Sequence, residues 1–330
     1  MDITKSVLIM MTTYNGERFL REQLDSILGQ TYPNFRLVIQ DDGSTDGTEE
    51  ILAGYAERDD RISLRKNEGP HGAYCNFHGL MNAVRQEEPA DYYMFSDQDD
   101  IWLPDKISFY VRAAESQSPD VPALFYSDVW IVDGEGRKTG KSLNDLLGIT
   151  YNNRWSLFYQ VNTYGCTFFF NRKLLVTVPP LDTEDPMTGR MPHDAYLAKF
   201  AAMLGKLHYV PQKLMLYRRY GGNVTSNQTF AISFHKVAER LLDFEKLAHD
   251  HAPTYTQSLF TIEKMEPLLP EKDRQTVREI RDSILKGGFP ALAVYLKYKI
   301  GVGKRARTVS KALVLLFGRY RKYLDGRVLP

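Results

Sequence analysis

Cysteine is scarce in this sequence, and long apolar runs are missing. The 330 residues include two cysteines, Cys75 and Cys166, which lie far apart and form no CxxC pair. This spacing argues against a disulfide framework and against a zinc site. No stretch approaches the ~20 apolar residues of a membrane-spanning helix, and no signal-like segment follows Met1. We therefore expect a cytoplasmic protein, either free or attached peripherally to the inner face of the cell membrane.

Acidic residues are nearly absent from the C-terminal end of the chain. Residues 286–330 hold eleven lysines and arginines but one acid, Asp325, so this segment carries a formal charge of +10. The whole chain carries +1, which leaves −9 for residues 1–285. The two parts are expected to face different partners.

Two common glycine motifs of nucleotide-binding proteins are also missing. No GxGxxG follows the first apolar run, and no GxxxxGK[ST] occurs in the chain. Neither a dinucleotide site nor a nucleotide-hydrolysing phosphate loop is therefore predicted.

The N-terminal part instead alternates apolar runs of strand length with segments of helical periodicity. The predicted strands are residues 6–11, 35–40, 62–65 and 92–96, and the predicted helices are residues 19–28, 48–56 and 76–85. Such alternation favours right-handed crossovers and a mainly parallel sheet with helices on both faces. The fold class is therefore α/β, and 43% hydrophobic residues suffice for a substantial core.

The pattern changes after Asp105. A helix at 107–114, strands within 123–132 and 166–170, a helix from His193, and two short strands at 207–210 and 214–218 extend the sheet, partly antiparallel. Residues 181–192 are rich in proline, acid and glycine and predict a mobile loop over the functional site. Beyond Thr229 the sequence predicts helices. The expected domains are a catalytic domain at 1–228 and a basic helical extension at 229–330.

Three carboxylates are packed into four positions where the aromatic strand at 92–96 ends. Asp97, Asp99 and Asp100 repel one another, so a cation is expected among them, and Mg²⁺ or Mn²⁺ suits carboxylate oxygens. The alternative is a solvated acidic turn in which Asp100 caps the next helix. The apolar strand before the cluster and Trp102 after it describe a half-buried site, which favours the metal.

Polar loops follow three of the predicted strands. They read Thr-Thr-Tyr-Asn-Gly-Glu at 12–17, Asp-Asp-Gly-Ser-Thr-Asp at 41–46 and Ser-Asp-Gln-Asp-Asp-Ile-Trp at 96–102. Because ligands of open parallel sheets bind beyond the carboxyl ends of the strands, we expect all three loops at one rim.

In this order the three loops resemble family 2 of the nucleotide-sugar glycosyltransferases, and the resemblance extends over about residues 6–225. It implies the GT-A fold, which is Rossmann-like, with a nucleotide-sugar-binding part at 1–106 and an acceptor-binding part at 107–228. Asp-Gln-Asp-Asp-Ile-Trp-Leu-Pro-Asp-Lys at 97–106, Pro-His-Asp at 192–194 and Tyr-Arg-x-x-Gly-x-Asn-Val at 217–224 are similar to bacterial rhamnosyltransferases. Those enzymes use dTDP-L-rhamnose to make O-antigens, capsules and cell-wall polysaccharides.

The donor-binding residues that the resemblance implies are Thr12, Tyr14, Asp42, Asn76, Asp97 and Arg218. Tyr14 offers a stacking face for the base, and the carboxylate of Asp42 would accept a hydrogen bond from the imide N–H of thymine or uracil. Asp41 and Asp42 have an alternative role as turn and helix caps, which Ser44 or Asp46 can fill instead.

The resemblance assigns the metal to Asp97 and Asp99, with Asp99 as the main direct ligand. A bound Mg²⁺ or Mn²⁺ would stabilise negative charge on the departing nucleoside diphosphate. The residues implied for the acceptor or sugar pocket are Asp100, Trp102, Gly165, Cys166 and His193. Trp102 and Cys166 have a structural alternative as core residues.

The resemblance also implies that the anomeric centre is inverted, and inversion by single displacement requires a base that takes the proton of the acceptor hydroxyl. Asp194 occupies the matching motif position and is the implied catalytic base, although an acid that opens a helix can also be a cap. Arg218 and Asn223 belong to a segment, 217–225, that is expected to close over the diphosphate. Many relatives have histidine at the position of Tyr220, so the resemblance does not imply a second metal or phosphate contact there.

The C-terminal arm combines apolar helical faces with many basic residues. Such helices suit an anionic membrane surface, where a lipid-linked glycan acceptor would be met. The alternative, of almost equal weight, is that the arm packs on the catalytic domain as a helical cap and exposes its basic face to solvent. A nucleic-acid partner is not expected, because the basic residues lie outside any reading motif.

The resemblance therefore implies a metal-dependent inverting glycosyltransferase that moves L-rhamnose from dTDP-L-rhamnose onto a glycan in bacterial surface polysaccharide biosynthesis. The alternative donor is a UDP-sugar, for transfer of a glucosyl, galactosyl or N-acetylhexosaminyl group. A nucleotidyltransferase would need a basic, glycine-rich loop, which 12–17 does not supply. A non-catalytic nucleotide-sugar-binding module would not need both Asp99 and Asp194.

Overall fold

The computed structural model describes residues 4–87, 89–221, 243–301 and 303–326. Contacts divide the chain into two compact units. Unit 1 comprises residues 1–143, 163–197 and 205–226, and unit 2 comprises 144–162, 198–204 and 227–330. Residues 144–162 and 198–204 thus group with the C-terminal helices, although both lie inside the expected catalytic domain. The expected boundary after residue 228 falls outside the described residues.

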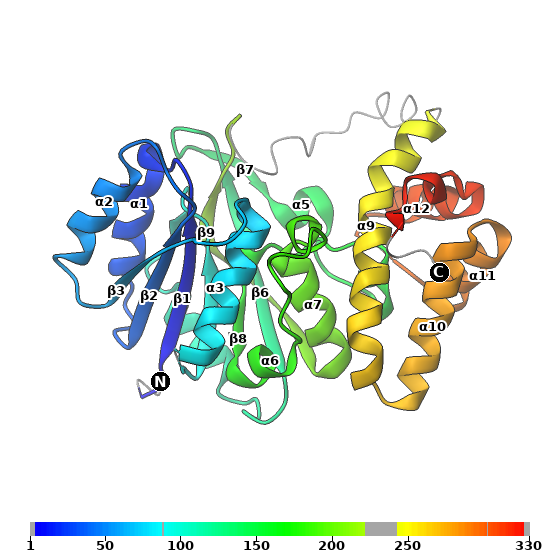
Figure 1. The fold of residues 1–330 in the computed structure, drawn as a ribbon, viewed down its shortest axis with the longest axis horizontal. Helices are drawn as coiled ribbons and strands as arrows, with labels where there is room; N and C mark the ends of the chain where they lie inside the picture. The colour runs from blue at the N-terminus through cyan, green and yellow to red at the C-terminus, as the bar shows by residue number, and fades with distance from the viewer. Residues whose placement is uncertain (1–3, 88, 222–242, 302, 327–330) are drawn as a thin grey trace. The chain divides into compact units, whose positions relative to one another are not determined.

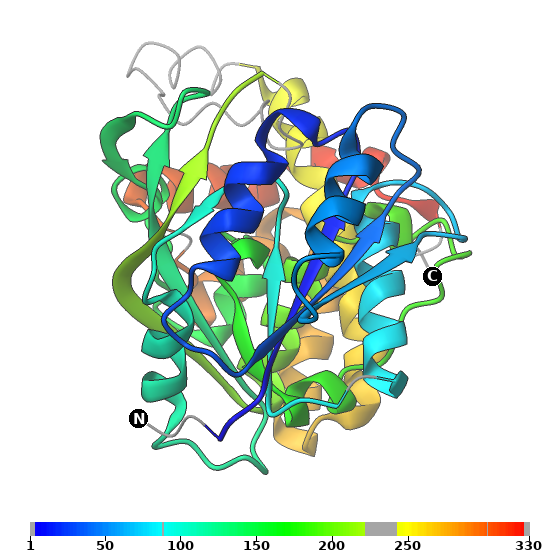
Figure 2. The ribbon, with the colours of Figure 1, turned by 90° about the vertical axis from the view of Figure 1, so that its left-hand side faces the viewer.

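The first half of unit 1 is a parallel sheet with crossover helices. Its elements are β1 (Val7–Thr13), α1 (Glu17–Leu28), β2 (Phe35–Asp41), α2 (Thr48–Ala56), β3 (Ile62–Lys66), α3 (Ala73–Glu87) and β4 (Tyr92–Ser96). The strands lie in the order β3-β2-β1-β4, all parallel. Every residue of β1 is buried, as expected for a strand covered on both faces. Figure 2 shows α1 and α3 on opposite sides of these strands.

The second half of unit 1 extends the sheet with mixed strand directions. It contains β5 (Ile101–Trp102), α4 (Lys106–Ala114), β6 (Ala123–Val132), β7 (Lys138–Ser142), η2 (Gly165–Thr167), β8 (Phe169–Asn171), α6 (Arg172–Thr177), η3 (Thr188–Arg190), the first part of α7 (His193–Leu204) and β9 (Lys206–Arg218). The order continues β4-β8-β6-β9-β5, with β8 antiparallel to both of its neighbours and β6 parallel to β9. The predicted α/β class with a partly antiparallel extension is confirmed.

One predicted pair of strands is wrong. Residues 207–210 and 214–218 belong to a single strand, β9, whose pairing with β6 shifts register next to Asp128. Val210 lies opposite Ser127 and Lys213 opposite Asp128, so two residues, one of them Pro211, are accommodated in a bulge. Proline has no N–H to donate, and it therefore fits where the ladder of hydrogen bonds is interrupted.

Aromatic packing anchors the strand that leads to the acidic cluster. The ring of Phe95 lies 5.2 Å from that of Phe170, and Tyr93 stacks on Phe170 at 5.8 Å. All three side chains are fully buried. The end of β4 is therefore held rigidly, and the loop that follows it starts from a fixed position.

Unit 2 is helical over its described residues. Its elements include η1 (Arg154–Phe158), α9 (Phe244–Met265), η4 (Glu266–Leu268), α10 (Glu271–Lys286), α11 (Gly288–Lys297), α12 (Arg305–Phe317) and η5 (Arg319–Tyr323), most of which Figure 1 labels. Four buried tyrosines form its core: Tyr159, Tyr255, Tyr295 and Tyr320. The predicted C-terminal helices are confirmed for these residues. No helix that the structure describes combines the length and the apolar character needed to cross a bilayer.

Candidate active site

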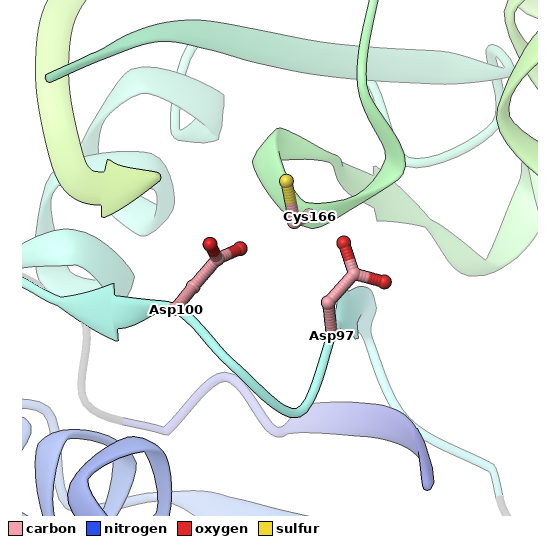
Figure 3. Close-up of side chains that lie close together, drawn as sticks. All are labelled: Asp97, Asp100 and Cys166. Atoms are coloured by element: carbon pink, nitrogen blue, oxygen red, sulfur yellow. The ribbon is translucent and has the colours of Figure 1, made fainter. Parts of the chain in front are cut away.

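The acidic loop, residues 97–100, connects β4 to β5 and brings carboxylates together with a thiol. Oxygen atoms of Asp97 and Asp100 and the Sγ of Cys166 all lie within 4.8 Å of one another. Figure 3 shows Asp97 and Asp100 projecting from the two ends of the loop, with Cys166 coming from a separate segment. That segment is η2, so the chain brings residues of the predicted donor and acceptor parts to one place.

Burial and the charges of neighbouring carboxylates raise the pKa of carboxyl groups in the acidic loop. Burial raises the pKa of Asp97, and the charges of Asp99 and Asp194 raise it further. The pKa of Asp100 is raised in the same direction by burial and by the charges of Asp99 and Asp97. Oδ2 of Asp100 is buried and has no hydrogen-bond partner among the described residues. A divalent cation would relieve both the repulsion and the missing contact.

The donor atoms fit a hard divalent ion at the carboxylates rather than at the thiol. Mg²⁺ and Mn²⁺ prefer oxygen ligands, which Asp97 and Asp100 supply. Burial, then the charges of Asp100 and Asp97, raise the pKa of Cys166, so its thiol stays protonated. The Asp99 carboxylate hydrogen-bonds with Tyr220. Burial of Tyr220 raises the pKa of this tyrosine most, and the charge of Asp99 raises it further. The role of Asp99 as the main ligand stays a prediction.

The loop after β1 is tied to the acidic loop through Gln98. The side chain of Gln98 accepts a hydrogen bond from the backbone N–H of Tyr14 at 2.8 Å and donates one to its carbonyl at 2.9 Å. Thr12 is buried at the end of β1, whereas the ring of Tyr14 is 55% exposed and available for stacking. The loop after β2 joins them, because the N–H of Thr45 donates to Oδ1 of Asn15 at 2.8 Å, so all three predicted loops meet at one rim.

The two aspartates after β2 have different partners. Asp41 accepts hydrogen bonds from the backbone N–H groups of Gly43 and Ser44, so it holds the turn. Asp42 instead accepts hydrogen bonds from the side chain of Asn67 at 2.6 Å and from the N–H of Gly72 at 2.7 Å. These two contacts bring the loop at 67–72 against Asp42. Its predicted contact with a base stays a prediction.

Asn76 lies in the core between α3 and β2. Its amide oxygen accepts a hydrogen bond from Gln40 at 2.7 Å, and the side chain is 1% exposed. This pairing gives Asn76 a structural role, and its predicted place beside the nucleoside is not tested by it.

Asp194 opens α7 and is bonded to η2. Its Oδ2 accepts a hydrogen bond from the N–H of Gly165 at 3.2 Å, and its Oδ1 accepts one from the N–H of Ala195 at 2.6 Å. A Cβ atom at position 165 would collide with Nε2 of His193, so glycine is required for this close approach. The predicted base and the predicted small-residue turn are thus neighbours.

His193 is buried and stacks on Phe77 with ring centroids 3.9 Å apart. Burial, then the charge of His78, lowers the pKa of His193 well below its usual value, so the imidazole is neutral. Neither of its ring nitrogens has a hydrogen-bond partner among the described residues. A neutral ring in this position can orient the site but is a poor proton acceptor.

Arg218 ends β9 and is 2% exposed. Its backbone N–H donates to Oδ1 of Asp100 at 3.0 Å, its Nε donates to the carbonyl of Asp99 at 2.9 Å, and its Nη2 pairs with Glu22. Arg218 therefore holds the acidic loop in shape, while its predicted contact with a diphosphate stays a prediction. Asn223, predicted beside it, lies outside the described residues.

Several residues of the site were not singled out by the sequence. Gln98, Asn67 and Glu22 bind parts of the chain that are distant in sequence, so no local pattern marks them. Lys106 was named only as the last residue of a motif, yet it is completely buried beside Trp102, which is itself 2% exposed. A basic residue at the start of a helix, against the helix dipole, was the one available signal.

Comparisons with known proteins agree on one family. A sequence model of glycosyl transferase family 2 matches residues 8–177, more than half of the chain. The dTDP-rhamnosyl transferase RfbG of Shigella flexneri is 29% identical over 235 residues, which cover 69% of this chain and 78% of that protein. An uncharacterized glycosyltransferase of Nostoc sp. is 28% identical over 228 residues, 65% of each chain, so this chain spans slightly less than two thirds of that relative.

Solved structures show the same fold. Residues 1–349 of TarS from S. aureus, in complex with UDP-GlcNAc, match with a TM-score of 0.51 and 16% identity over 98% of this chain and 93% of that one. The complex of the same protein with UDP gives a TM-score of 0.52 at 14% identity, with the same coverage. The fold is of the GT-A type with a C-terminal helical region.

Proposed function

The chain belongs to glycosyl transferase family 2, and from this membership we propose that it transfers a sugar from a nucleotide sugar to a glycan hydroxyl, with inversion. One observation carries the proposal. Turn η2 contacts both the acidic loop and the start of α7, because Sγ of Cys166 lies within 4.8 Å of carboxylate oxygens of Asp97 and Asp100 and the N–H of Gly165 donates to Oδ2 of Asp194 at 3.2 Å. This arrangement supplies a place for a diphosphate and a base beside it.

Asp194 is the proposed general base. Its two carboxylate oxygens are oriented by the N–H groups of Gly165 and Ala195, which fix the direction of the side chain without using up its lone pairs. An acceptor hydroxyl that approaches from the side of η2 would give its proton to Asp194 as its oxygen attacks the anomeric carbon. Single displacement of this kind inverts the configuration.

Asp97 and Asp100 would hold the metal, and Asp99 belongs to the same loop. When bound, Mg²⁺ or Mn²⁺ supplies electrostatic stabilisation of the departing diphosphate. The protein contributes a preorganised loop, because Arg218 holds the carbonyl of Asp99 and one oxygen of Asp100. Residues 1–106 would bind the donor and residues 107–228 the acceptor.

We propose dTDP-L-rhamnose as the donor, which the 29% identity to the rhamnosyl transferase RfbG supports. A UDP-sugar is the alternative. Asp42 cannot separate these two, because thymine and uracil present the same imide N–H to a carboxylate. Discrimination would have to come from contacts to the 5-methyl group and to the sugar.

We also propose that a face of unit 2 contacts an anionic membrane carrying a lipid-linked acceptor. On α11, Phe289 is 79% exposed and Leu296 63%, and on α12 Val309 is 58% exposed. Lys304 and Arg305, at the start of α12, are exposed as well. Exposed apolar side chains together with exposed cations are typical of helices that lie in a membrane interface. A peripheral location on the cytoplasmic side would follow.

A thermal-shift panel tests the donor proposal. Each of dTDP-L-rhamnose, UDP-GlcNAc and UDP-glucose is added with and without Mn²⁺, and release of nucleoside diphosphate is followed with water as the acceptor. We expect dTDP-L-rhamnose to raise the melting temperature most, and more with Mn²⁺ than without. Asp97→Asn should lose the Mn²⁺-dependent part, whereas Asp120→Asn, a change of an exposed carboxylate, should retain it.

Two results would change the proposal. A shift with a UDP-sugar but none with dTDP-L-rhamnose would replace the donor and keep the reaction class. A protein whose melting temperature responds to no nucleotide sugar would contradict sugar transfer. A response of the same size with and without Mn²⁺ would contradict the role of the metal.

A further inference from the structure

Lys106, the first residue of α4, is completely buried. Its Nζ donates a hydrogen bond to the carbonyl of Cys166 at 2.6 Å and lies 3.3 Å from Sδ of Met215. The same ammonium sits 3.6 Å from the ring centroid of Trp102. Lysine is almost never fully buried without a partner, so these contacts must offset a substantial desolvation penalty.

The acids of the site act on Lys106 from a distance rather than by direct pairing. Burial lowers the pKa of Lys106 to about 7, while the charges of Asp100 and Asp97 act in the opposite direction. None of the described carboxylates forms a salt bridge with it. The strong contact is the hydrogen bond to a backbone carbonyl, which both the ammonium and the neutral amine can donate.

That carbonyl belongs to η2, the same turn that holds Asp194. Helix α4 binds η2 twice, because Tyr110, one turn after Lys106, donates a hydrogen bond to the carbonyl of Thr167. On its other side, η2 donates the N–H of Gly165 to Asp194. A continuous chain of hydrogen bonds and covalent backbone thus runs from Lys106 through η2 to the proposed base.

We propose that Lys106 is a positioning residue that fixes Asp194 through η2. Without the bond to Cys166 the turn would shift, and the carboxylate that follows it would leave the line of attack. Positioning errors of ~1 Å can lower a rate about 100-fold. This inference rests on the proposed role of Asp194 as a base, and it extends that role to a residue that touches neither donor nor acceptor.

Lys106→Met is the first test, because methionine keeps most of the volume and removes the donor. The probe is the nucleotide sugar selected by the thermal-shift panel, with water as the acceptor and Mn²⁺ present. We expect kcat for nucleoside diphosphate release to fall roughly 10- to 100-fold, while the Kd for the donor changes less than about threefold. Lys141→Met, an exposed lysine on β7, should leave both unchanged.

A double-mutant cycle with Asp194→Asn identifies the route of the effect. If Lys106 acts through Asp194, Lys106→Met should lower kcat less than about twofold further in the Asp194→Asn background. Multiplicative losses in the double mutant would overturn the proposal, because they would mean that Lys106 supports the protein in another way. If Asp194→Asn alone leaves kcat unchanged, the proposed base fails, and this is a separate result from the test of Lys106.

Two further variants keep the test decisive if Lys106→Met does not fold. Lys106→Gln retains a donor on a shorter side chain, and Tyr110→Phe removes only the second bond to η2. Each should lower kcat at constant donor Kd, by about threefold or more, and each effect should vanish in the Asp194→Asn background. Folded variants of both positions with wild-type kcat would contradict the proposal.

Discussion

Unit 1 buries Lys106 and unit 2 buries Lys199 and Lys311, and the surroundings of Lys106 and Lys311 differ. Lys106 in unit 1 donates to a carbonyl at 2.6 Å, lies on the face of Trp102, and has its pKa supported by the charges of Asp100 and Asp97. Lys311 in unit 2 lies 5.4 Å from the ring centroid of Tyr255, and its neighbour Arg307 is also a cation. Burial lowers the pKa of both side chains to about 7.

These surroundings indicate that a buried lysine can have two different effects, on the geometry of a site or on the stability of the fold. Around Lys106 the polar contacts are arranged so that the ammonium supports a turn beside the acidic loop. Around Lys311 the structure describes no hydrogen bond or ion pair that offsets the loss of solvation. We therefore expect changes of charge in the core of unit 1 to affect turnover, and changes of charge in the core of unit 2 to affect stability.

The largest expected effect comes from Asp194→Asn in unit 1. The amide keeps the shape of the side chain but cannot accept the proton, so kcat should fall by ~10² to 10⁴. Donor affinity and the urea midpoint should remain close to those of the wild type. Product analysis by NMR with an acceptor sugar checks the mechanism, because retention of the anomeric configuration would contradict both the base and single displacement.

The strands and loops of this site could be predicted from the sequence, because each depends on local pattern. The apolar run of β1 and the polar residues that end β1, β2 and β4 are visible without any knowledge of contacts. Which aspartate holds the turn after β2 was not predictable, since Asp41 and Asp42 are neighbours and their partners are set by the path of the loop at 67–72. The predicted functional roles of these residues remain predictions.

The role of Lys106 could not be predicted for a similar reason. Its partners, Cys166 and Met215, are 60 and 109 positions away in the sequence. A lysine after Pro-Asp at the start of a helix normally reads as a solvated residue. The bulge at Pro211 was missed because the interruption of the apolar pattern is the same for a bulge as for a break between two strands.

Lys311→Met gives the second largest effect and concerns stability alone. Replacing a buried ammonium, for which the described residues supply no hydrogen bond or ion pair, with an apolar side chain of similar length should raise the free energy of unfolding by about 1–4 kcal/mol. Urea denaturation measures the gain. Turnover should be unchanged, and a variant that is less stable than the wild type at pH 7 would show that Lys311 is compensated after all.

The pH dependence of that gain is a sharper measurement on the same pair of proteins. An unfolded lysine has a pKa of 10.5, and burial lowers that of Lys311 to about 7. Between these values the unfolded state binds more protons, so the stability of the wild type should rise with pH, by ~1.4 kcal/mol per unit at most. The advantage of Lys311→Met should therefore be largest at pH 7 and below, and should shrink as the pH approaches 10.5. A constant difference would contradict the titration of Lys311.

Asp42→Asn tests a residue of unit 1 that is expected to contribute to donor binding but not to the chemical step. A base contact is alike in the ground and transition states, so the Kd for the donor should rise roughly tenfold while kcat changes little. Asn67→Ala is the matched control, because it removes a partner of Asp42 and leaves the carboxylate in place. A large fall in kcat at saturating donor would place Asp42 in the chemical step.

The smallest expected effect concerns an exposed charge of unit 2, where solvent already screens the side chain. If the face formed by α11 and α12 lies on an anionic membrane, Lys304→Gln should weaken binding to phosphatidylglycerol-containing vesicles about fivefold, since each basic residue near the surface contributes ~1 kcal/mol. Binding to phosphatidylcholine vesicles should not change. Lys141→Gln, an exposed lysine of unit 1, is the control and should bind both vesicles as the wild type does. Equal binding of Lys304→Gln and wild type to the anionic vesicles, in a sedimentation assay at low salt, would remove the membrane from this face and leave its cations as an ordinary solvated surface.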